Sequence, residues 1–201
     1  MKNSIIILLL FALGVALGVT GKLPDSMLET DFSIMALYCL MFLVGVGIGA
    51  DKKSWSVIHK MKLKILLVPA GIVIGTFAGA GIASLLLPEL KFKEVLAVGS
   101  GFGYYSLSSL LITQLASESL GVIALLSNIM REMITLLTTP LLVMYFGKLA
   151  GISAGGATSM DTTLPVITRF SGKEWSIISV FSGIVLTILV PVLVTLVLKY
   201  F

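Results

Sequence analysis

Seven apolar stretches, each near the length needed to cross a lipid bilayer, follow one another through this 201-residue chain. A helix needs about 20 apolar residues to span the hydrocarbon core. With 57% hydrophobic and 12% charged residues, the pattern predicts an all-α polytopic membrane protein that forms one domain over residues 1–201. No room remains for a soluble catalytic domain, so we expect no enzyme, no cofactor and no resident metal. The stretches cover approximately residues 3–20, 32–50, 65–87, 95–115, 121–147, 152–168 and 175–198.

The first stretch has two readings. Met1-Lys2 followed by an apolar run resembles a signal peptide, but residues 20–22 make a poor cleavage site and the run is long enough to span. We interpret it as the first transmembrane helix.

Basic residues predict the orientation of the chain. Five lysines lie between residues 51 and 64, and lysine-rich loops stay on the cytoplasmic side. The N-terminus is then cytoplasmic and the C-terminus external, with eight basic residues inside, including Arg169 and Lys173, and five outside, including Lys148. The net charge of +4 is a topology signal and indicates no nucleic-acid partner.

Two stretches contain glycine and hydroxyl residues where an ordinary span would hold leucine, isoleucine and valine. Residues 99–109 read GSGFGYYSLSS, and residues 153–163 read SAGGATSMDTT. Paired interrupted segments are typical of transporter sites, because helix ends and freed carbonyls meet there at mid-membrane. The alternative is that small residues merely permit close helix packing. We expect both segments to be discontinuous or re-entrant, with Ser100 and Tyr104 as candidate site residues in the first.

The second broken segment carries Asp161, which cannot face lipid at bilayer depth. Pro165 has no N–H, so the carbonyl of Asp161 should lose its helical partner and leave backbone oxygen beside the carboxylate. Gly155 and Gly156 permit an unwound backbone whose N–H groups could meet an anionic group. The segment therefore predicts a site for both ends of a zwitterion, with hydroxyls nearby from Thr158, Ser159, Thr162 and Thr163.

A polar stripe marks the stretch 121–147. Its members follow helical spacing and are Asn128, Arg131, Glu132, Thr135 and Thr139. Either a structural salt-bridge network or a substrate or proton role explains it. In the second case Glu132 binds, and Arg131 balances its charge or meets a substrate carboxylate. Because a desolvated carboxylate gives up its charge readily, Asp161 and Glu132 at one cavity would make cation/proton exchange chemically natural.

The segments GFGYYSLSS, SNIMRE (residues 127–132) and ISAGGATSMDTTLP (residues 152–165) together resemble the bacterial lysine exporter family, LysO. The resemblance covers nearly the whole chain. It implies export of L-lysine and toxic analogues such as thialysine across the cytoplasmic (inner) membrane, with required intramembrane acids at Asp161 and Glu132. It also implies a fold of the cation/proton antiporter type, with crossing discontinuous helices.

This chain departs from the family pattern in length. Typical members look about a hundred residues longer, so the chain resembles their C-terminal, site-bearing portion. A companion small membrane subunit or a homodimer would then complete the transporter. The alternatives are export or exchange of another cation or basic amino acid, and a subunit that only stabilises a partner. An intramembrane aspartyl protease would need a second aspartate at depth, and Asp161 stands alone there.

Overall fold

The computed structural model describes residues 63–200, together with six isolated helical positions before residue 50, and the elements within the described range are all helices. The first two predicted spans and most of the lysine-rich loop lie outside the described residues. The α-helices are α5 (Leu67–Leu86), α6 (Phe92–Gly99), α7 (Tyr105–Leu115), α8 (Glu118–Phe146), α9 (Leu149–Gly155), α10 (Leu164–Ser171) and α11 (Ser176–Tyr200). Short 3-10 helices are η1 (Leu63–Leu66), η2 (Gly156–Met160) and η3 (Lys173–Trp175).

Three helices in this range are long and apolar enough to cross a membrane: α5, α8 and the segment that contains α11. Helix α8 has 29 residues, and at 1.5 Å per residue it is about 44 Å long, more than the ~30 Å hydrocarbon core requires. These three confirm an integral membrane protein. The other two predicted spans, 95–115 and 152–168, are each broken in the middle, as their glycine and hydroxyl content predicts.

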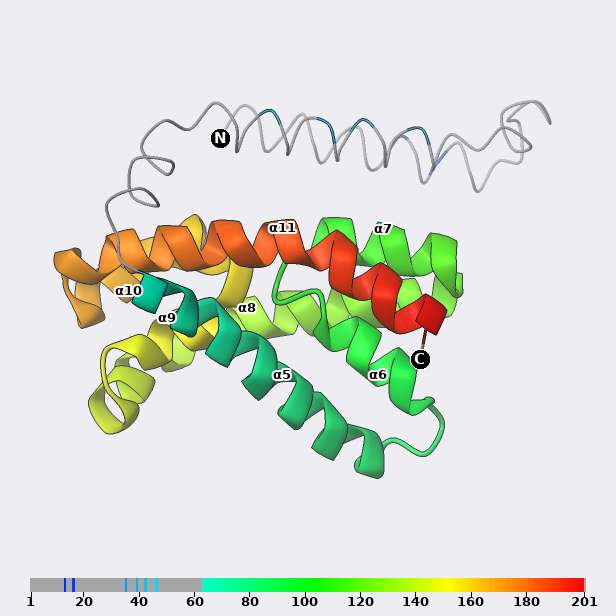
Figure 1. Ribbon diagram of the computed structural model, residues 1–201, viewed down its shortest axis with the longest axis horizontal. Helices are drawn as coiled ribbons and strands as arrows, with labels where there is room; N and C mark the ends of the chain where they lie inside the picture. Colours follow the sequence, from blue (N-terminus) through cyan, green and yellow to red (C-terminus); the bar gives the residue numbers. More distant parts are fainter. Residues whose placement is uncertain are drawn as a thin grey trace. The chain divides into compact units, whose positions relative to one another are not determined.

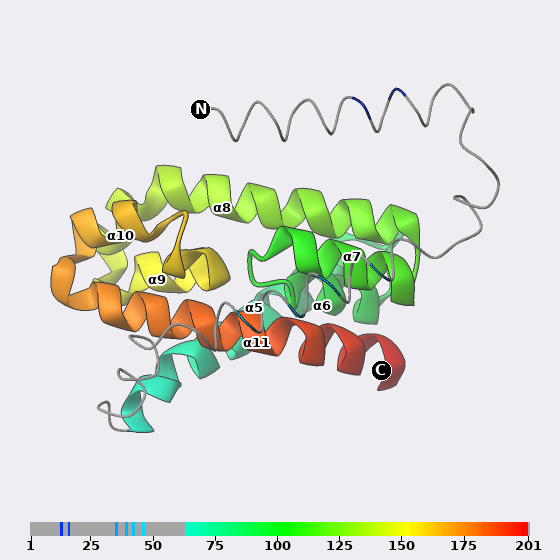
Figure 2. The same cartoon turned by 90° about the horizontal axis from the view of Figure 1, so that it is seen from above.

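The first broken segment folds into a hairpin of α6 and α7. Helix α6 ends at Gly99, and the chain turns where Phe102 and Gly103 both have positive φ, 47° and 95°. Helix α7 then runs back along α8, so that Thr113 near its end lies against Gly121 near the start of α8. Both halves of the hairpin extend toward the same end of the helix bundle in two perpendicular views (Figures 1 and 2).

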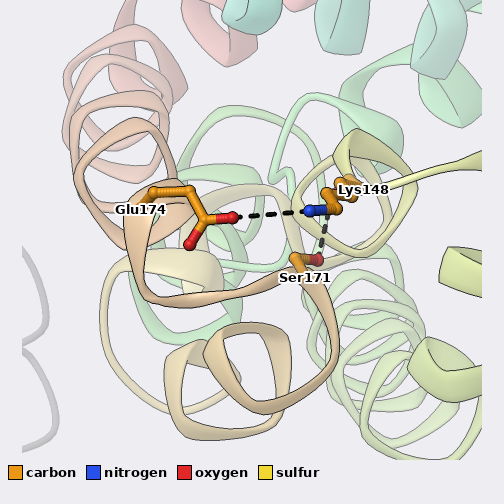
Figure 3. Close-up of polar contacts among 3 residues, drawn as sticks. All are labelled: Lys148, Ser171 and Glu174. Atoms are coloured by element: carbon orange, nitrogen blue, oxygen red, sulfur yellow. Dashed lines mark hydrogen bonds and ion pairs between the residues drawn. The ribbon is translucent and has the colours of Figure 1, made fainter.

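The second broken segment, α9–η2–α10, is also a hairpin. Its two ends meet, because the hydroxyl of Ser171 donates to the carbonyl oxygen of Lys148 at 2.8 Å and the Lys148 Nζ lies 3.4 Å from Glu174 Oε1 (Figure 3). A segment that enters and leaves at one end does not cross the bilayer. Our placement of Lys148 and Lys173 on opposite sides was therefore wrong, since hydropathy measures the length of an apolar stretch and not its direction.

The tips of the two hairpins meet between the long helices. Hairpin α6–α7 approaches from one end of the bundle and hairpin α9–α10 from the other (Figures 1 and 2). The amide of Ala157 donates to the carbonyl oxygen of Phe102 at 2.8 Å. Both breaks leave backbone groups without helical partners, and in an apolar surrounding each unpaired group would cost several kcal/mol. The tips reduce this cost by pairing with one another.

Helix α11 supports the second tip closely. Ser159 and Ser179 exchange hydrogen bonds, each hydroxyl donating to the carbonyl oxygen of the other residue at 3.0 and 2.7 Å. Beside them Gly183 leaves no room for a side chain, because a Cβ there would lie 2.6 Å from that of Met160. The 3-10 turn η2 therefore lies directly on the backbone of α11, which fixes the depth at which the tip ends.

Candidate functional site

The contact between the hairpin tips depends on glycines. Gly156 has a φ of 61°, and a Cβ on it would collide with the carbonyl oxygen of Phe102. A Cβ on Gly103 would lie 3.1 Å from the carbonyl oxygen of Gly155. The Gly155–Gly156 pair was predicted to let the backbone unwind, and helix α9 does end there, with Gly156 beginning η2. The glycines allow two backbones to touch where side chains would hold them apart.

Asn128 of α8 holds the tip of hairpin α6–α7. Its Oδ1 accepts from the amide of Gly103 at 2.7 Å, and its Nδ2 donates to the carbonyl oxygen of Val98 at 3.3 Å and to Ser108 Oγ at 3.5 Å. Asn128 lies so close to the turn that a Cβ on Gly101 would be 2.5 Å from its Nδ2. The buried amide therefore bonds a carbonyl of α6, an amide of the turn and a hydroxyl of α7, and Asn128 is a positioning residue in this structure.

Arg131, one turn further along α8, holds the other tip. Its Nε donates to the carbonyl oxygen of Ala154 at 2.9 Å and its Nη2 to that of Ser153 at 3.1 Å. Both carbonyls lie in the last turn of α9, where a cation is favoured by the helix dipole. The guanidinium also reaches Thr76 Oγ1 of α5 at 3.4 Å. The polar stripe predicted on this helix therefore exists, and within it Asn128 and Arg131 each hold one of the two hairpins.

A small cavity opens beside the crossing, and Asp161 lines it. Its volume is about 80 Å³, smaller than the ~300 Å³ or more of typical small-molecule sites. Tyr104 and Thr162 were predicted to belong to the site and do line it. Sequence reasoning did not single out Tyr105, Ser106 and Met160, although the first two belong to the GFGYYSLSS motif. The full lining is Gly103, Tyr104, Tyr105, Ser106, Ala157, Thr158, Met160, Asp161 and Thr162.

The Asp161 side chain is exposed, and its bonds are local. Oδ1 accepts from the amide and the hydroxyl of Thr162, its neighbour in the chain. The predicted orphan carbonyl does not exist: the oxygen of Asp161 accepts from the amide of Leu164 at 3.2 Å, because the backbone tightens into a turn before Pro165. Its carboxylate therefore remains able to bind a cation, without the adjacent free carbonyl that we expected.

Glu132 lies on α8 next to Arg131 and is half-buried. It does not line the Asp161 cavity, and it forms no ion pair with Arg131 within the part of the chain that the structure describes. The two predicted carboxylates therefore do not share one cavity wall.

Three of the predicted site hydroxyls make structural bonds. Ser100 Oγ donates to the carbonyl oxygen of Leu96 at 2.8 Å, and Thr158 Oγ1 donates to that of Gly155 at 2.9 Å. Ser159 Oγ turns toward α11, away from the cavity. Among residues 63–200, no group of three His, Cys, Asp or Glu side chains gathers closely enough to hold a metal ion. The arrangement is suited to binding a cationic group at a helix break.

A family model described as "Lysine exporter LysO" matches residues 8–198. The chain is 31% identical over 182 residues to "Lysine exporter LysO" of Escherichia coli (strain K12), which covers 90% of this chain and 60% of that relative. It is also 31% identical over 166 residues to "Putative lysine exporter" of Haemophilus influenzae (strain ATCC 51907 / DSM 11121 / KW20 / Rd), covering 80% of this chain and 81% of the relative. No solved structure matches it. The match over residues 8–198 and these relatives together show that the chain belongs to the lysine exporter LysO family.

Proposed function

We propose that this chain exports L-lysine, and analogues such as thialysine, across the cytoplasmic membrane. The observation that carries the proposal is the position of Asp161 at the point where two hairpin tips cross between membrane-spanning helices. A carboxylate there meets a cationic substrate at mid-membrane, where its charge is least screened by water. Membership of a lysine exporter family favours lysine as that cation.

Proton-coupled antiport is the transport mechanism that we propose. Asp161 lines the cavity at the crossing, and Glu132 follows Arg131, whose side chain holds the same crossing. A carboxylate in a poorly solvated site avoids an unpaired charge either by binding a cation or by binding a proton. If lysine and the proton compete for these carboxylates, loading one releases the other, and an inward proton gradient drives lysine outward. Tyr104 and Thr162 would hydrogen-bond the bound group from the cavity wall.

The second hairpin supports one orientation of the chain in the membrane. Lys148 lies at the same end as Glu174, next to Lys173, so all three belong on one side of the membrane. We propose that this is the cytoplasmic side, which changes the predicted distribution of basic residues from eight inside and five outside to nine and four. The α5–α6 turn, the α7–α8 turn and the end of α11 are then external.

The chain spans 60% of the length of the Escherichia coli relative. We therefore keep a companion membrane subunit or a homodimer as the partner that would complete the transporter. The alternatives are export or exchange of arginine, ornithine or another cation, and a subunit that stabilises a partner without binding substrate itself.

Thialysine resistance tests the proposal. A strain without lysine exporters would express the chain alone, the chain with its neighbouring membrane gene, and the Asp161→Asn variant. We expect at least one wild-type combination to grow at thialysine concentrations that stop the empty strain, and Asp161→Asn to lose this resistance. Unchanged sensitivity in every wild-type combination would contradict lysine export. Full resistance of Asp161→Asn would contradict the site.

A further inference from the structure

A second cavity lies between α5, α6 and α8. Its volume is about 450 Å³, within the range of sites that enclose small molecules. It shares no lining residue with the Asp161 cavity. We call it the α5/α8 crevice. Its lining includes Thr76 and Ala83 of α5, Val98 of α6, and Ser127 and Arg131 of α8.

The crevice has an inner and an outer end. Arg131 and Thr76 face one another at 3.4 Å and mark the inner end, at the depth of the hairpin tips. Along α8 the lining residues step back by single turns from Arg131 to Ser127 and Ile123, while α5 continues to Leu87. The crevice therefore runs from the crossing toward the turn between α5 and α6, which is the external end in the orientation proposed above.

The charge at the inner end is positive and has no acidic partner within the described range 63–200. Arg131 has five N–H donors, and its acceptors among residues 63–200 are two carbonyl oxygens and one hydroxyl. One donor on each terminal nitrogen thus remains without an acceptor in the described part. A guanidinium at bilayer depth requires water or an anion, and two donors on different nitrogens match the two oxygens of a carboxylate.

Both cavities border the crossing. Ala157, which bonds the Phe102 carbonyl, lines the Asp161 cavity, and Arg131, which donates to the last turn of α9, lines the crevice. Asp161 and Arg131 thus line two different cavities at one crossing. A zwitterionic amino acid carries both charges that these two side chains would bind, a cationic amine and a carboxylate.

We propose that the α5/α8 crevice is the outward vestibule of the transporter, and that Arg131 there binds the carboxylate of the amino acid that Asp161 releases. This inference rests on the proposed export of lysine. It assigns a binding role to a second cavity, in which Arg131, Thr76 and Ser127 are the polar lining residues among apolar ones. Binding in the crevice requires water along its length, which distinguishes it from a groove filled by lipid tails or by another helix.

Cysteine labelling tests the vestibule by comparing two adjacent positions on α5 and two on α8, one of each pair inside the crevice and one outside it. The parent is Cys39→Ser, because Cys39 is the only cysteine of the chain. Ala83→Cys and Ser127→Cys lie in the crevice, whereas Ile82→Cys and Leu126→Cys lie one residue away, at side chains that are 65% and 56% exposed and outside its lining. We expect a membrane-impermeant cationic thiol reagent, added from outside, to label the crevice cysteines about tenfold faster, since a thiol surrounded by lipid ionises poorly.

Protection of these cysteines by added small molecules tests which ligand the crevice binds. External L-lysine should slow the labelling of Ser127→Cys, one turn from Arg131, about threefold or more, while cadaverine, which has the same amine but no carboxylate, should not. Equal labelling within each pair, no labelling, or labelling from the cytoplasmic side alone would overturn the vestibule. Equal protection by cadaverine would overturn the role of Arg131. Lysine export is measured in the same parent cells: its absence would contradict the proposed function, whereas export with unreactive crevice cysteines would contradict the vestibule alone.

Discussion

The amide of Ala157 donates a hydrogen bond of 2.8 Å to the carbonyl oxygen of Phe102, although the two residues are 55 positions apart in the sequence. This bond joins the tips of two hairpins that enter the helix bundle from opposite ends. Helix α8 holds both, with Asn128 on one tip and Arg131 on the other. The crossing is therefore a single hydrogen-bonded unit, and Asp161 lies four residues beyond its central bond.

The glycine at the crossing should not tolerate a side chain. We predict that Gly156→Ala lowers lysine export by more than about tenfold, because its φ of 61° costs an L-residue ~1–2 kcal/mol and its Cβ would meet the Phe102 carbonyl. Gly75→Ala on α5 is the control, since a Cβ there meets nothing within 4 Å. Export and the amount of folded protein in membranes are measured for both. Normal export by Gly156→Ala would show that the tips need not touch.

Removing the side chain of Asn128 should loosen the first hairpin. We predict that Asn128→Ala lowers the free energy of unfolding by about 1–3 kcal/mol, since the Gly103 amide loses its buried acceptor. Thr138→Ala is the matched control on the same helix, because its hydroxyl donates only to the carbonyl oxygen of Ile134, one turn before it. Thermal unfolding in detergent compares the two. Equal melting temperatures would contradict the positioning role of Asn128.

The second hairpin predicts a topology that differs from a simple count of spans. Cysteines introduced as Lys148→Cys and Lys173→Cys in a Cys39→Ser background should react with an impermeant thiol reagent from the cytoplasmic side only. The Lys148–Glu174 pair is exposed to solvent, so its loss should leave the fold intact. Reaction of the two cysteines from opposite sides would mean that residues 149–171 cross the membrane.

Replacing the Asp161 carboxylate should reduce transport without reducing the stability of the fold. Its side chain is exposed and, among residues 63–200, hydrogen-bonds Thr162 alone, so Asp161→Asn should keep the wild-type melting temperature while export falls by more than about tenfold. Glu132→Gln is expected to lower export as well, because it removes the second carboxylate of the proposed proton exchange. Thr168→Ala on α10 is the control for melting temperature and export, because its hydroxyl donates to the carbonyl oxygen of Leu164 and does not line the cavity. A large loss of stability in Asp161→Asn would assign the carboxylate a structural role.

Much of this arrangement follows from residue types alone. Glycine and hydroxyl residues inside apolar stretches predicted both breaks, because an uninterrupted span has no need of them. The direction of the chain after each break could not be predicted. Helices α6 and α7 have 8 and 11 residues, and apolar segments of this length can continue across the bilayer or fold back.

The partners of the polar stripe also could not be read from the sequence. Spacing placed Asn128, Arg131 and Glu132 on neighbouring positions of one helix, but it does not show which backbone groups they meet. Arg131 binds carbonyls of α9 because that helix ends beside it, and no sequence pattern predicts this contact. The carbonyl of Asp161 shows the same limit: Pro165 removes one donor, and the turn supplies another from Leu164.

Lysine transport by purified protein in lipid vesicles tests the central claim most directly. Vesicles loaded with radiolabelled L-lysine would carry the wild type, with its neighbouring membrane protein if export requires it, or the Asp161→Asn variant. We predict that a proton gradient directed into the loaded compartment drives lysine out through the wild type, and that Asp161→Asn abolishes this flux while remaining folded. Gradient-driven lysine efflux that is equal in Asp161→Asn and the wild type would contradict the role of the carboxylate at the crossing.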